Sequence, residues 1–229
     1  MAIEPLKWDS EFFKLKIGKI NSGNFSPSKF DEQKILFDLI YIFEYPNSTL
    51  IAEIENAKAI LVDKKVIYQK KIIAISKDEH ITTYTSTIAN ENLIQLALQS
   101  GIHSRFKIDK NFESSFYEKL YNEWIIKSCS REIAFEVLVY GDEKDPDGFI
   151  TIQQKNNEAH VGLIAVHERA RGKGIGKKLM EAAELIAKNH TFDTIKVTTQ
   201  ADNIQACSLY EKCGFTINET NHIYHYWNK

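Results

Sequence analysis

Six consecutive residues, Arg171-Gly172-Lys173-Gly174-Ile175-Gly176, combine three glycines with two basic side chains directly after an apolar segment. Glycines let a backbone approach a ligand closely and allow several N–H groups to point in one direction. A helical apolar pattern begins immediately afterwards, so this segment would form the N-terminus of a helix, which carries roughly half a positive charge. The residue types and their order therefore predict an anion-binding loop suited to a pyrophosphate.

The spacing of these glycines excludes two familiar nucleotide-binding loops. A P-loop needs Gly-x-x-x-x-Gly-Lys-Ser/Thr, and a dinucleotide fingerprint needs Gly-x-Gly-x-x-Gly, whereas Gly172, Gly174 and Gly176 are each two residues apart. A glycine-rich turn alone is also consistent with a tight connection between a strand and a helix. The choice between ligand binding and a plain turn therefore depends on a second motif.

That second motif follows further along the chain. Asn203-x-x-Ala-x-x-Leu-Tyr210-x-Lys-x-Gly-Phe215 comes after the expected strand Thr194–Gln200. Together with the earlier pattern Arg-x-x-Gly-x-Gly, it resembles the GNAT superfamily of acyl-CoA-dependent N-acetyltransferases. The resemblance is close over residues 148–215 and looser from Leu93 onward.

The resemblance implies a GNAT acyl-CoA N-acyltransferase fold of the α+β class, with a mixed sheet. It also implies that the co-substrate is acetyl-CoA and that no metal is needed. The pantetheine arm would bind along a strand in which a β-bulge exposes backbone donors, and these donors could also stabilise a developing oxyanion. The residues implied in binding acetyl-CoA are Ile164, Ala165, Val166, Arg171, Gly172, Lys173, Gly174, Ile175, Gly176, Lys177 and Asn203.

Tyr210 is the candidate general acid that the resemblance implies. It follows Asn203 by seven residues on one expected helix, so the two side chains share nearly one face. A phenol with a pKa of about 10 is protonated at neutral pH and can donate to a departing thiolate. The alternatives are a core tyrosine at position 210 and a helix N-cap at position 203.

His160 is the candidate general base, because histidine titrates in the range useful for draining a proton from an amine. Glu158 is a second candidate, since strand alternation puts it on the same face as His160. A partly exposed strand histidine with no catalytic role explains the position equally well.

The substrate side is suggested by shorter motifs. Three short motifs look similar to dTDP-fucosamine acetyltransferases, which N-acetylate a 4-amino-4,6-dideoxy sugar carried on dTDP. They are Ile3–Phe13, Ser104-Arg105-Phe106, and Phe116-Tyr117 with Trp124 beyond. This resemblance implies a nucleotide-linked amino sugar as the small-molecule partner, with Ser104, Arg105 and Phe106 binding it. A salt bridge on a solvated loop is the plainer explanation for Arg105, and a grip on the diphosphate is the functional one.

The apolar pattern predicts the elements that would position these residues. We expect a small N-terminal α/β subdomain over residues 1–78 and the acetyltransferase domain over 79–229, with the boundary near 76–80. The expected helices are 35–43, one around Leu93–Ala97 that ends at Gly101, one around Phe116–Trp124, one around Leu179–Ile186, and 203–213. The expected strands are 16–20, 49–53, 65–71, 135–140, 148–153, 158–166, 194–200 and 216–227.

Composition limits the classes of protein to consider. The chain has 229 residues, of which 43% are hydrophobic, and a net charge of −2, so a globular protein with a sizeable core is expected. A charge so nearly balanced argues against nucleic acid and anionic membranes as partners.

The three cysteines are odd in number and lack Cys-x-x-Cys spacing, which favours a reducing compartment. No apolar run is long enough for a membrane span and no signal peptide is expected, so we predict a cytoplasmic protein and leave a homodimer open.

Three functions compete at this point. The leading one is acetylation of a nucleotide-linked amino sugar for cell-surface polysaccharide synthesis. The second is acetylation of another small amine or of a protein N-terminus. The third is a non-catalytic acyl-CoA-binding module, which the intact glycine loop together with Tyr210 argues against.

Overall fold

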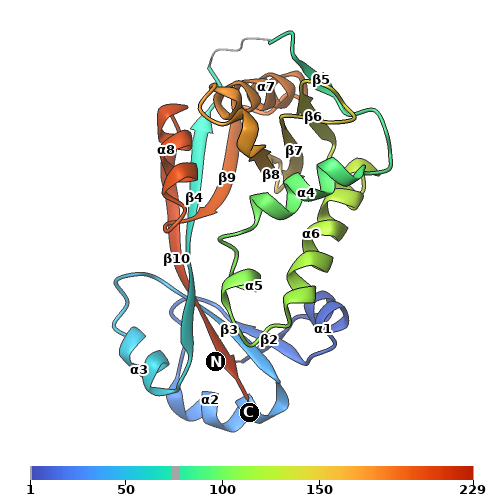
Figure 1. Cartoon of the computed structure of the whole chain (residues 1–229). Coiled ribbons are helices and arrows are strands. Elements are labelled where there is room, and N and C mark those ends of the chain that lie inside the picture. Colours follow the sequence, from blue (N-terminus) through green and yellow to red (C-terminus); the bar gives the residue numbers. More distant parts are fainter. Residues whose placement is uncertain (1, 74–77, 229) are drawn as a thin grey trace. The chain divides into compact units, whose positions relative to one another are not determined.

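The computed structural model describes residues 2–73 and 78–228 (Figure 1). These residues pack into two compact units. The terminal unit comprises Met1–Val66 with Glu219–Lys229, and the central unit comprises Ile67–Asn218. Two long strands, β4 (Ile60–Lys71) and β10 (Thr216–Trp227), have residues in both units.

The terminal unit is built on strands in the order β1-β2-β3-β10. β3 is parallel to β2 on one edge and antiparallel to β10 on the other, where Ile42 lies opposite Tyr224. The remaining elements of this unit are β1 (Glu4–Pro5), α1 (Lys7–Phe13), β2 (Ile17–Ile20), α2 (Pro27–Gln33), the short 3₁₀ helix η1 (Lys34–Leu36), β3 (Leu39–Glu44) and α3 (Ile51–Asn56).

One hydrophobic core stabilises the terminal unit. Ile40 and Ile42 of β3 and Tyr224 and Tyr226 of β10 alternate onto one face, where they pack with Phe30 of α2. The Phe30 ring meets the Tyr226 ring edge-on at 4.9 Å, and both side chains are buried. Residues from the start and from the end of the sequence therefore share this core.

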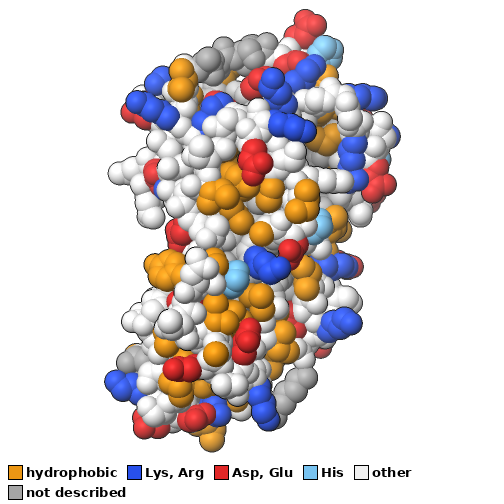
Figure 2. All heavy atoms as spheres, turned by 90° about the vertical axis from the view of Figure 1, so that its left-hand side faces the viewer, with side chains coloured by type: hydrophobic (Ala, Val, Ile, Leu, Met, Phe, Trp, Pro, Cys, Tyr) orange, Lys and Arg blue, Asp and Glu red, His pale blue; other side chains and the backbone are white. Residues whose placement is uncertain are grey.

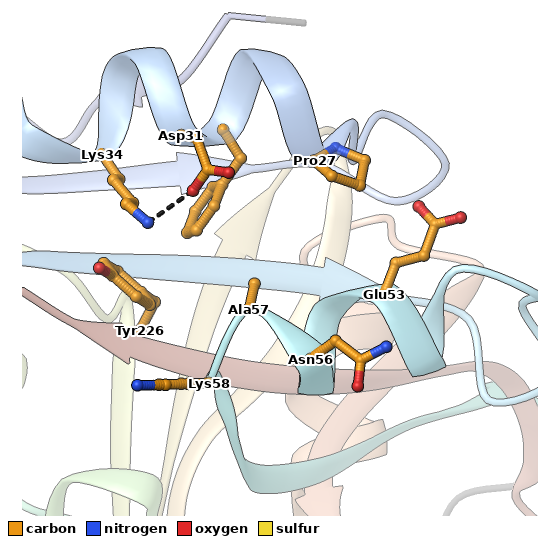
Figure 3. Close-up of a pocket in the computed structure, with 9 residues that line it drawn as sticks. Pro27, Asp31, Lys34, Glu53, Asn56, Ala57, Lys58 and Tyr226 are labelled. Atoms are coloured by element: carbon orange, nitrogen blue, oxygen red, sulfur yellow. Dashed lines mark hydrogen bonds and ion pairs between the residues drawn. The ribbon is translucent and has the colours of Figure 1, made fainter.

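A cavity of about 470 Å³ opens beside this core, within the terminal unit. Figure 3 shows Lys34 and Asp31 at one wall, joined by an ion pair of 2.5 Å, with Tyr226 facing them. The Lys34 ammonium lies 5.7 Å from the Tyr226 ring centre and 5.8 Å from that of Phe30. The hydrogen bond to Asp31 raises the pKa of Lys34, so this wall carries a fixed cation.

The central unit contains strands in the order β4-β9-β8-β7-β6-β5, of which β8 and β9 are parallel and β5 to β8 are antiparallel. Its strands are β5 (Ile81–Thr83), β6 (Glu136–Tyr140), β7 (Gly148–Lys155), β8 (Glu158–Val166) and β9 (Thr194–Gln200). Its helices are α4 (Glu91–Ser100), α5 (Arg105–Ile108), α6 (Ser114–Cys129), the 3₁₀ helix η2 (Glu168–Ala170), α7 (Ile175–Asn189) and α8 (Ile204–Lys212).

Helices cover both faces of this part of the sheet. The five successive residues Gly148–Ile152 of β7 are all buried, which requires a covering layer on each side. α4 packs on β7 and β8 and lies beside α6, while α7 packs across β6 to β9 (Figure 1). This mixed sheet covered by helices is the α+β architecture that the sequence predicts.

The expected elements of the central unit are confirmed. The predicted strands 158–166 and 194–200 coincide with β8 and β9, and the predicted helices coincide with α4, α6, α7 and α8 to within a few residues. These segments have long and regular apolar patterns, which are the patterns that identify secondary structure most reliably.

Two expectations in the terminal unit are wrong. The predicted helix 35–43 is the short η1 followed by β3, and the predicted strand 49–53 lies mostly in α3. β3 is buried at five of its six positions between two strands, and a continuous apolar run of that length cannot be told from a buried helix by periodicity. α3 is only six residues long, so its helical pattern covers less than two turns.

The predicted domain division at residue 78 stays a prediction. The predicted boundary at 76–80 lies partly outside the described residues, whereas the compact units divide the chain within β4 and β10.

Two further properties concern the described residues, 2–73 and 78–228. None of their helices is both long and apolar enough to cross a membrane. Nor do these residues bring three His, Cys, Asp or Glu side chains together in a way that could hold a metal ion. On the face drawn in Figure 2, acidic and basic side chains are intermixed, in agreement with the small net charge.

Candidate active site

A β-bulge interrupts the pairing of β7 with β8. Ile150 lies opposite Ile164, but Ile152 lies opposite Val161, so β8 has one residue more than β7 between these pairs. The two residues of β8 in this interval are Gly162 and Leu163. The bulge that the resemblance implies is therefore present, directly before Ile164-Ala165-Val166.

β8 and β9 stop pairing at the same place. Their parallel pairing runs from Ala159 opposite Ile195 to Val161 opposite Val197. No further pair joins the two strands, both of which lie wholly within the described chain. The edge of β8 beyond the bulge therefore has backbone groups that β9 does not bind.

The amides of Ile164 and Val166 point toward that edge. The Leu163 amide donates to Thr151 Oγ1 at 2.8 Å, and the His167 amide donates to the Asp147 carbonyl at 2.8 Å, so both face the β7 side. Successive amides of a strand point to opposite edges, so those of Ile164 and Val166 face the β9 side. Both residues are half-buried.

The glycine loop, residues 171–176, has open space next to its backbone, where an anion could bind. Gly172 and Gly174 have φ of +79° and +76°, and no heavy atom lies within 4 Å of the position a Cβ would take at either residue. Gly174 is the N-cap of α7, so the first N–H groups of that helix point into this space. The loop therefore presents backbone donors and a helix dipole to one open region, and Lys173 between the two glycines is exposed.

Gly176 brings three elements together. A Cβ at this position would lie 3.1 Å from Leu209 of α8 and 3.8 Å from Val166 of β8. Arg171 also reaches β8, because its Nε donates to the Val166 carbonyl at 3.4 Å. The glycine loop, the end of β8 and α8 are therefore neighbours, as the resemblance requires.

The side chain of Tyr210 is almost fully buried, with 3% of its surface exposed. Its ring packs against Tyr68 at 5.7 Å and Phe215 at 6.2 Å. Burial raises the pKa of Tyr210, because the phenolate would be poorly solvated there. The phenol is therefore protonated at every physiological pH. The sequence left a core tyrosine and a proton donor as alternatives at this position, and a core location agrees with both.

Asn203 is the N-cap of α8. Its Oδ1 accepts a hydrogen bond from the Ala206 amide at 3.2 Å, which is the structural alternative that the sequence left open. The predicted contact of Asn203 with the cofactor stays a prediction.

His160 lies on β8 within a small charged cluster. It is opposite Gln153 of β7 and Lys196 of β9. Its Nε2 is 3.9 Å from Glu158 Oε2, and that oxygen also accepts from Lys196 Nζ at 2.7 Å. The predicted shared face of His160 and Glu158 is thus confirmed. Glu158 is therefore already paired with a lysine.

The three residues predicted on the substrate side lie at α5. Ser104 is the N-cap of this short helix, with its hydroxyl accepting from the Phe106 amide at 3.3 Å, and it is buried. The Arg105 guanidinium lies 4.7 Å from the Phe106 ring centre. Their role in binding substrate stays a prediction.

Three residues at this site were missed by reasoning from the sequence. Gln99 of α4 donates to the Val166 carbonyl at 3.4 Å, Thr151 binds the bulge, and Gly162 belongs to it. An isolated glycine inside a strand pattern is a known sign of a bulge, so Gly162 could have been found. Gln99 and Thr151 follow no local pattern and depend on tertiary packing.

Comparison with known proteins agrees with this geometry. Residues 102–215 match the model of the acetyltransferase (GNAT) family. The uncharacterized N-acetyltransferase YvbK of Bacillus subtilis (strain 168) is 30% identical over 112 residues, which cover 46% of this chain and 72% of YvbK. The chain belongs to the GNAT family of acetyltransferases.

Two further similarities extend the match beyond the GNAT motifs. The spore coat polysaccharide biosynthesis protein SpsD of Bacillus subtilis (strain 168) is 27% identical over 139 residues, covering 60% of this chain. The matched region spans 47% of SpsD, which is less than half of that relative. The crystal structure of a GCN5-related N-acetyltransferase from Sphaerobacter thermophilus superposes with a TM-score of 0.54 at 14% identity, over 87% of this chain and 64% of that one. That structural likeness concerns the fold.

Proposed function

We propose that this protein is an acetyl-CoA-dependent N-acetyltransferase whose acceptor is the amine of a nucleotide-linked amino sugar. The proposed acceptor is a dTDP-linked 4-amino-4,6-dideoxyhexose, and the acetylated sugar would be used in surface polysaccharide synthesis. The reaction would take place in the cytoplasm. One observation carries the acetyltransferase part, namely the bulged edge of β8 beside the open glycine loop of α7. Membership in the GNAT family supports the same activity.

The residues at this site fit an acyl-CoA. The open positions at Gly172 and Gly174 and the N-terminus of α7 suit a pyrophosphate, which a Cβ at either glycine would obstruct. The unpaired edge of β8 suits the amide groups of a pantetheine arm. Acetyl-CoA supplies an acetyl group already activated as a thioester.

In the proposed reaction, backbone amides and two side chains of this chain would each have one role. The amides of Ile164 and Val166 would donate to the carbonyl oxygen as negative charge develops on it. The amine nitrogen forms a bond to the carbonyl carbon, and the carbon–sulfur bond breaks. Tyr210 would give its proton to the departing thiolate, and His160 would take the proton of the new amide nitrogen through water.

The amino-sugar acceptor has weaker support, from two observations. The name of SpsD refers to polysaccharide biosynthesis, and the motifs around Ile3–Phe13 and Ser104–Phe106 resemble enzymes that act on dTDP-linked amino sugars. In this proposal Ser104, Arg105 and Phe106 contact the nucleotide part, with the Arg105 guanidinium on the diphosphate.

A panel of acceptors tests the proposal. The purified protein would be mixed with acetyl-CoA and with dTDP- and UDP-linked amino sugars, other small amines and an N-terminal peptide, and free thiol would be measured. We expect the fastest release with a dTDP-linked 4-amino sugar. Faster release with another amine would replace the acceptor, and acetyl-CoA binding without thiol release from any amine would favour a non-catalytic module.

A further inference from the structure

Thr151 lies in the middle of β7, and its side chain is fully buried. It accepts the amide of Leu163, a residue of the bulge, at 2.8 Å. In a regular ladder that amide would bind a backbone carbonyl, so the side chain takes the place of the missing ladder partner.

Gly162 makes this contact sterically allowed. A Cβ at Gly162 would lie 2.7 Å from Thr151 Oγ1 and 2.3 Å from Gln153 Nε2, closer than real Cβ atoms come to their neighbours. Any larger residue would therefore displace the hydroxyl from the bulge. Gly162 and Thr151 therefore act together at the bulge. The glycine leaves space for the Thr151 hydroxyl, and this hydroxyl accepts the hydrogen bond of the Leu163 amide.

The position of the bulge decides which amides reach the candidate site. Without the extra residue, the pairing of Ile152 with Val161 would continue regularly, and Ile164 would lie opposite Phe149 instead of Ile150. A shift of one residue sends each amide to the other edge of the strand. The amides of Ile164 and Val166 would then enter the ladder with β7 and leave the β9 side.

We propose that Thr151 is a positioning residue that holds the β8 bulge in the register that turns the Ile164 and Val166 amides toward acyl-CoA. This inference rests on the proposed function, because it assigns these amides to the thioester and pantetheine. Thr151 itself touches neither substrate. It acts through the backbone of Leu163.

Two substitutions at one position separate the hydroxyl from the packing. Thr151→Val keeps the shape and removes the acceptor, whereas Thr151→Ser keeps the acceptor and removes a methyl group. We expect Thr151→Val to lower kcat by ~10²-fold, the scale of losing one oxyanion donor, with a less than threefold change in the KM for the amine. Thr151→Ser should retain kcat within about threefold, because hydroxyl rescue is what the proposal requires.

A matched control removes a different buried hydroxyl. Ser128 of α6 is fully buried, and its Oγ donates to the Trp124 carbonyl at 2.7 Å, away from β8. Ser128→Ala should lose a comparable amount of stability and keep kcat. If Thr151→Val keeps kcat as Ser128→Ala does, or if Thr151→Ser loses as much as Thr151→Val, the positioning role is wrong.

Amide hydrogen exchange followed by NMR tests the bulge without any turnover. The Leu163 amide should exchange at least tenfold faster in Thr151→Val than in both the wild type and Ser128→Ala, and an unchanged rate would overturn the inference. A wild-type protein that acetylates no amine would contradict the proposed function instead, and the exchange result would still decide whether Thr151 holds the bulge.

Discussion

At the scale of single residues, Tyr210 and His160 have very different surroundings. Tyr210 is enclosed by Tyr68 and Phe215, and burial raises its pKa. His160 lies on a half-exposed strand face next to Glu158 and Lys196. The raised pKa keeps the phenol of Tyr210 protonated at physiological pH, whereas an imidazole can exchange protons with water. The roles of Tyr210 as general acid and of His160 as general base belong to the proposed mechanism, and the variants below test them.

Replacing Tyr210 with Phe removes one proton donor and leaves the ring. We expect kcat to fall by ~10²-fold with little change in the affinity for acetyl-CoA, because the hydroxyl would act only as the thiolate leaves. Stability should change by less than about 1.5 kcal/mol, since no cavity forms. Steady-state kinetics and calorimetry measure these quantities, and a folded Phe variant with wild-type kcat would refute the role.

The raised pKa of Tyr210 also predicts a pH dependence. A folded pKa above the ordinary value of about 10 keeps the phenol protonated up to that pH, so it should cause no loss of rate between about pH 6 and 9. The stability gained by burying the neutral phenol is likewise complete below about pH 10 and is lost as the pH rises further. A loss of rate near pH 8 that disappears in Tyr210→Phe would contradict this assignment.

His160→Ala should lower kcat at neutral pH by ~10²-fold, the usual scale for general base catalysis. The rate should recover at high pH, because the amine is then already neutral. Glu158→Gln is the matched comparison, since Glu158 is held by Lys196 at 2.7 Å and should contribute less. If His160→Ala keeps near wild-type rates from pH 6 to 9, His160 has only a structural role. If Glu158→Gln loses more activity than His160→Ala, Glu158 is the general base instead.

At the scale of elements, the glycine loop and the N-terminus of α7 form one unit. Gly174 is the last residue before the helix and has a left-handed backbone, which directs the first N–H groups outward. Gly176, in the first turn, allows α8 to approach. Gly174 therefore leaves open space at the start of the helix, whereas Gly176 allows close packing between elements.

Gly174→Val tests the loop against a control with matched backbone geometry. Gly23 of the terminal unit has a φ of +75°, compared with +76° at Gly174, and a Cβ at either residue would meet open space. Both Val variants should lose similar stability from the strained φ. Only Gly174→Val should weaken acetyl-CoA binding in calorimetry, by more than tenfold, which is about 1.4 kcal/mol. If the two folded variants bind acetyl-CoA with equal affinity, the glycine loop does not bind the cofactor.

The sequence predicts the helices and strands that carry this site better than the contacts between them. The order of β8, the glycine loop, α7, β9 and α8 follows from regular apolar patterns and two motifs. The acceptor role of Thr151 and the contact of Gln99 with β8 depend on the alignment of distant segments, which no local pattern contains. β3 was mistaken for a helix because both of its faces are buried.

At the scale of the whole molecule, the terminal unit has two separate stretches of sequence. Tyr224 and Tyr226 of β10 complete the core that Phe30, Ile40 and Ile42 begin. β10 also occupies one edge of β3 over the six residues 39–44, opposite 222–227. We therefore expect β3 and β10 to open together, as one cooperative segment.

Tyr226→Ala tests this coupling. It removes a buried ring that contacts Phe30, at a cost of about 3 kcal/mol. Amide exchange should accelerate in residues 39–44 as much as in 222–227, while β6 and β7 of the central unit keep their protection. Faster exchange in 222–227 alone would show that the two strands open independently.

The pairing of β3 with β10 has a consequence for protein synthesis. Leu39–Glu44 leaves the ribosome early, but its antiparallel neighbour, residues 222–227, is made only after the whole central unit. At ~5–20 residues per second, this apolar strand edge waits on the order of ten seconds or longer for its partner. An unpaired apolar edge is a site of aggregation, so the nascent chain is vulnerable at β3 until residues 222–227 have been made.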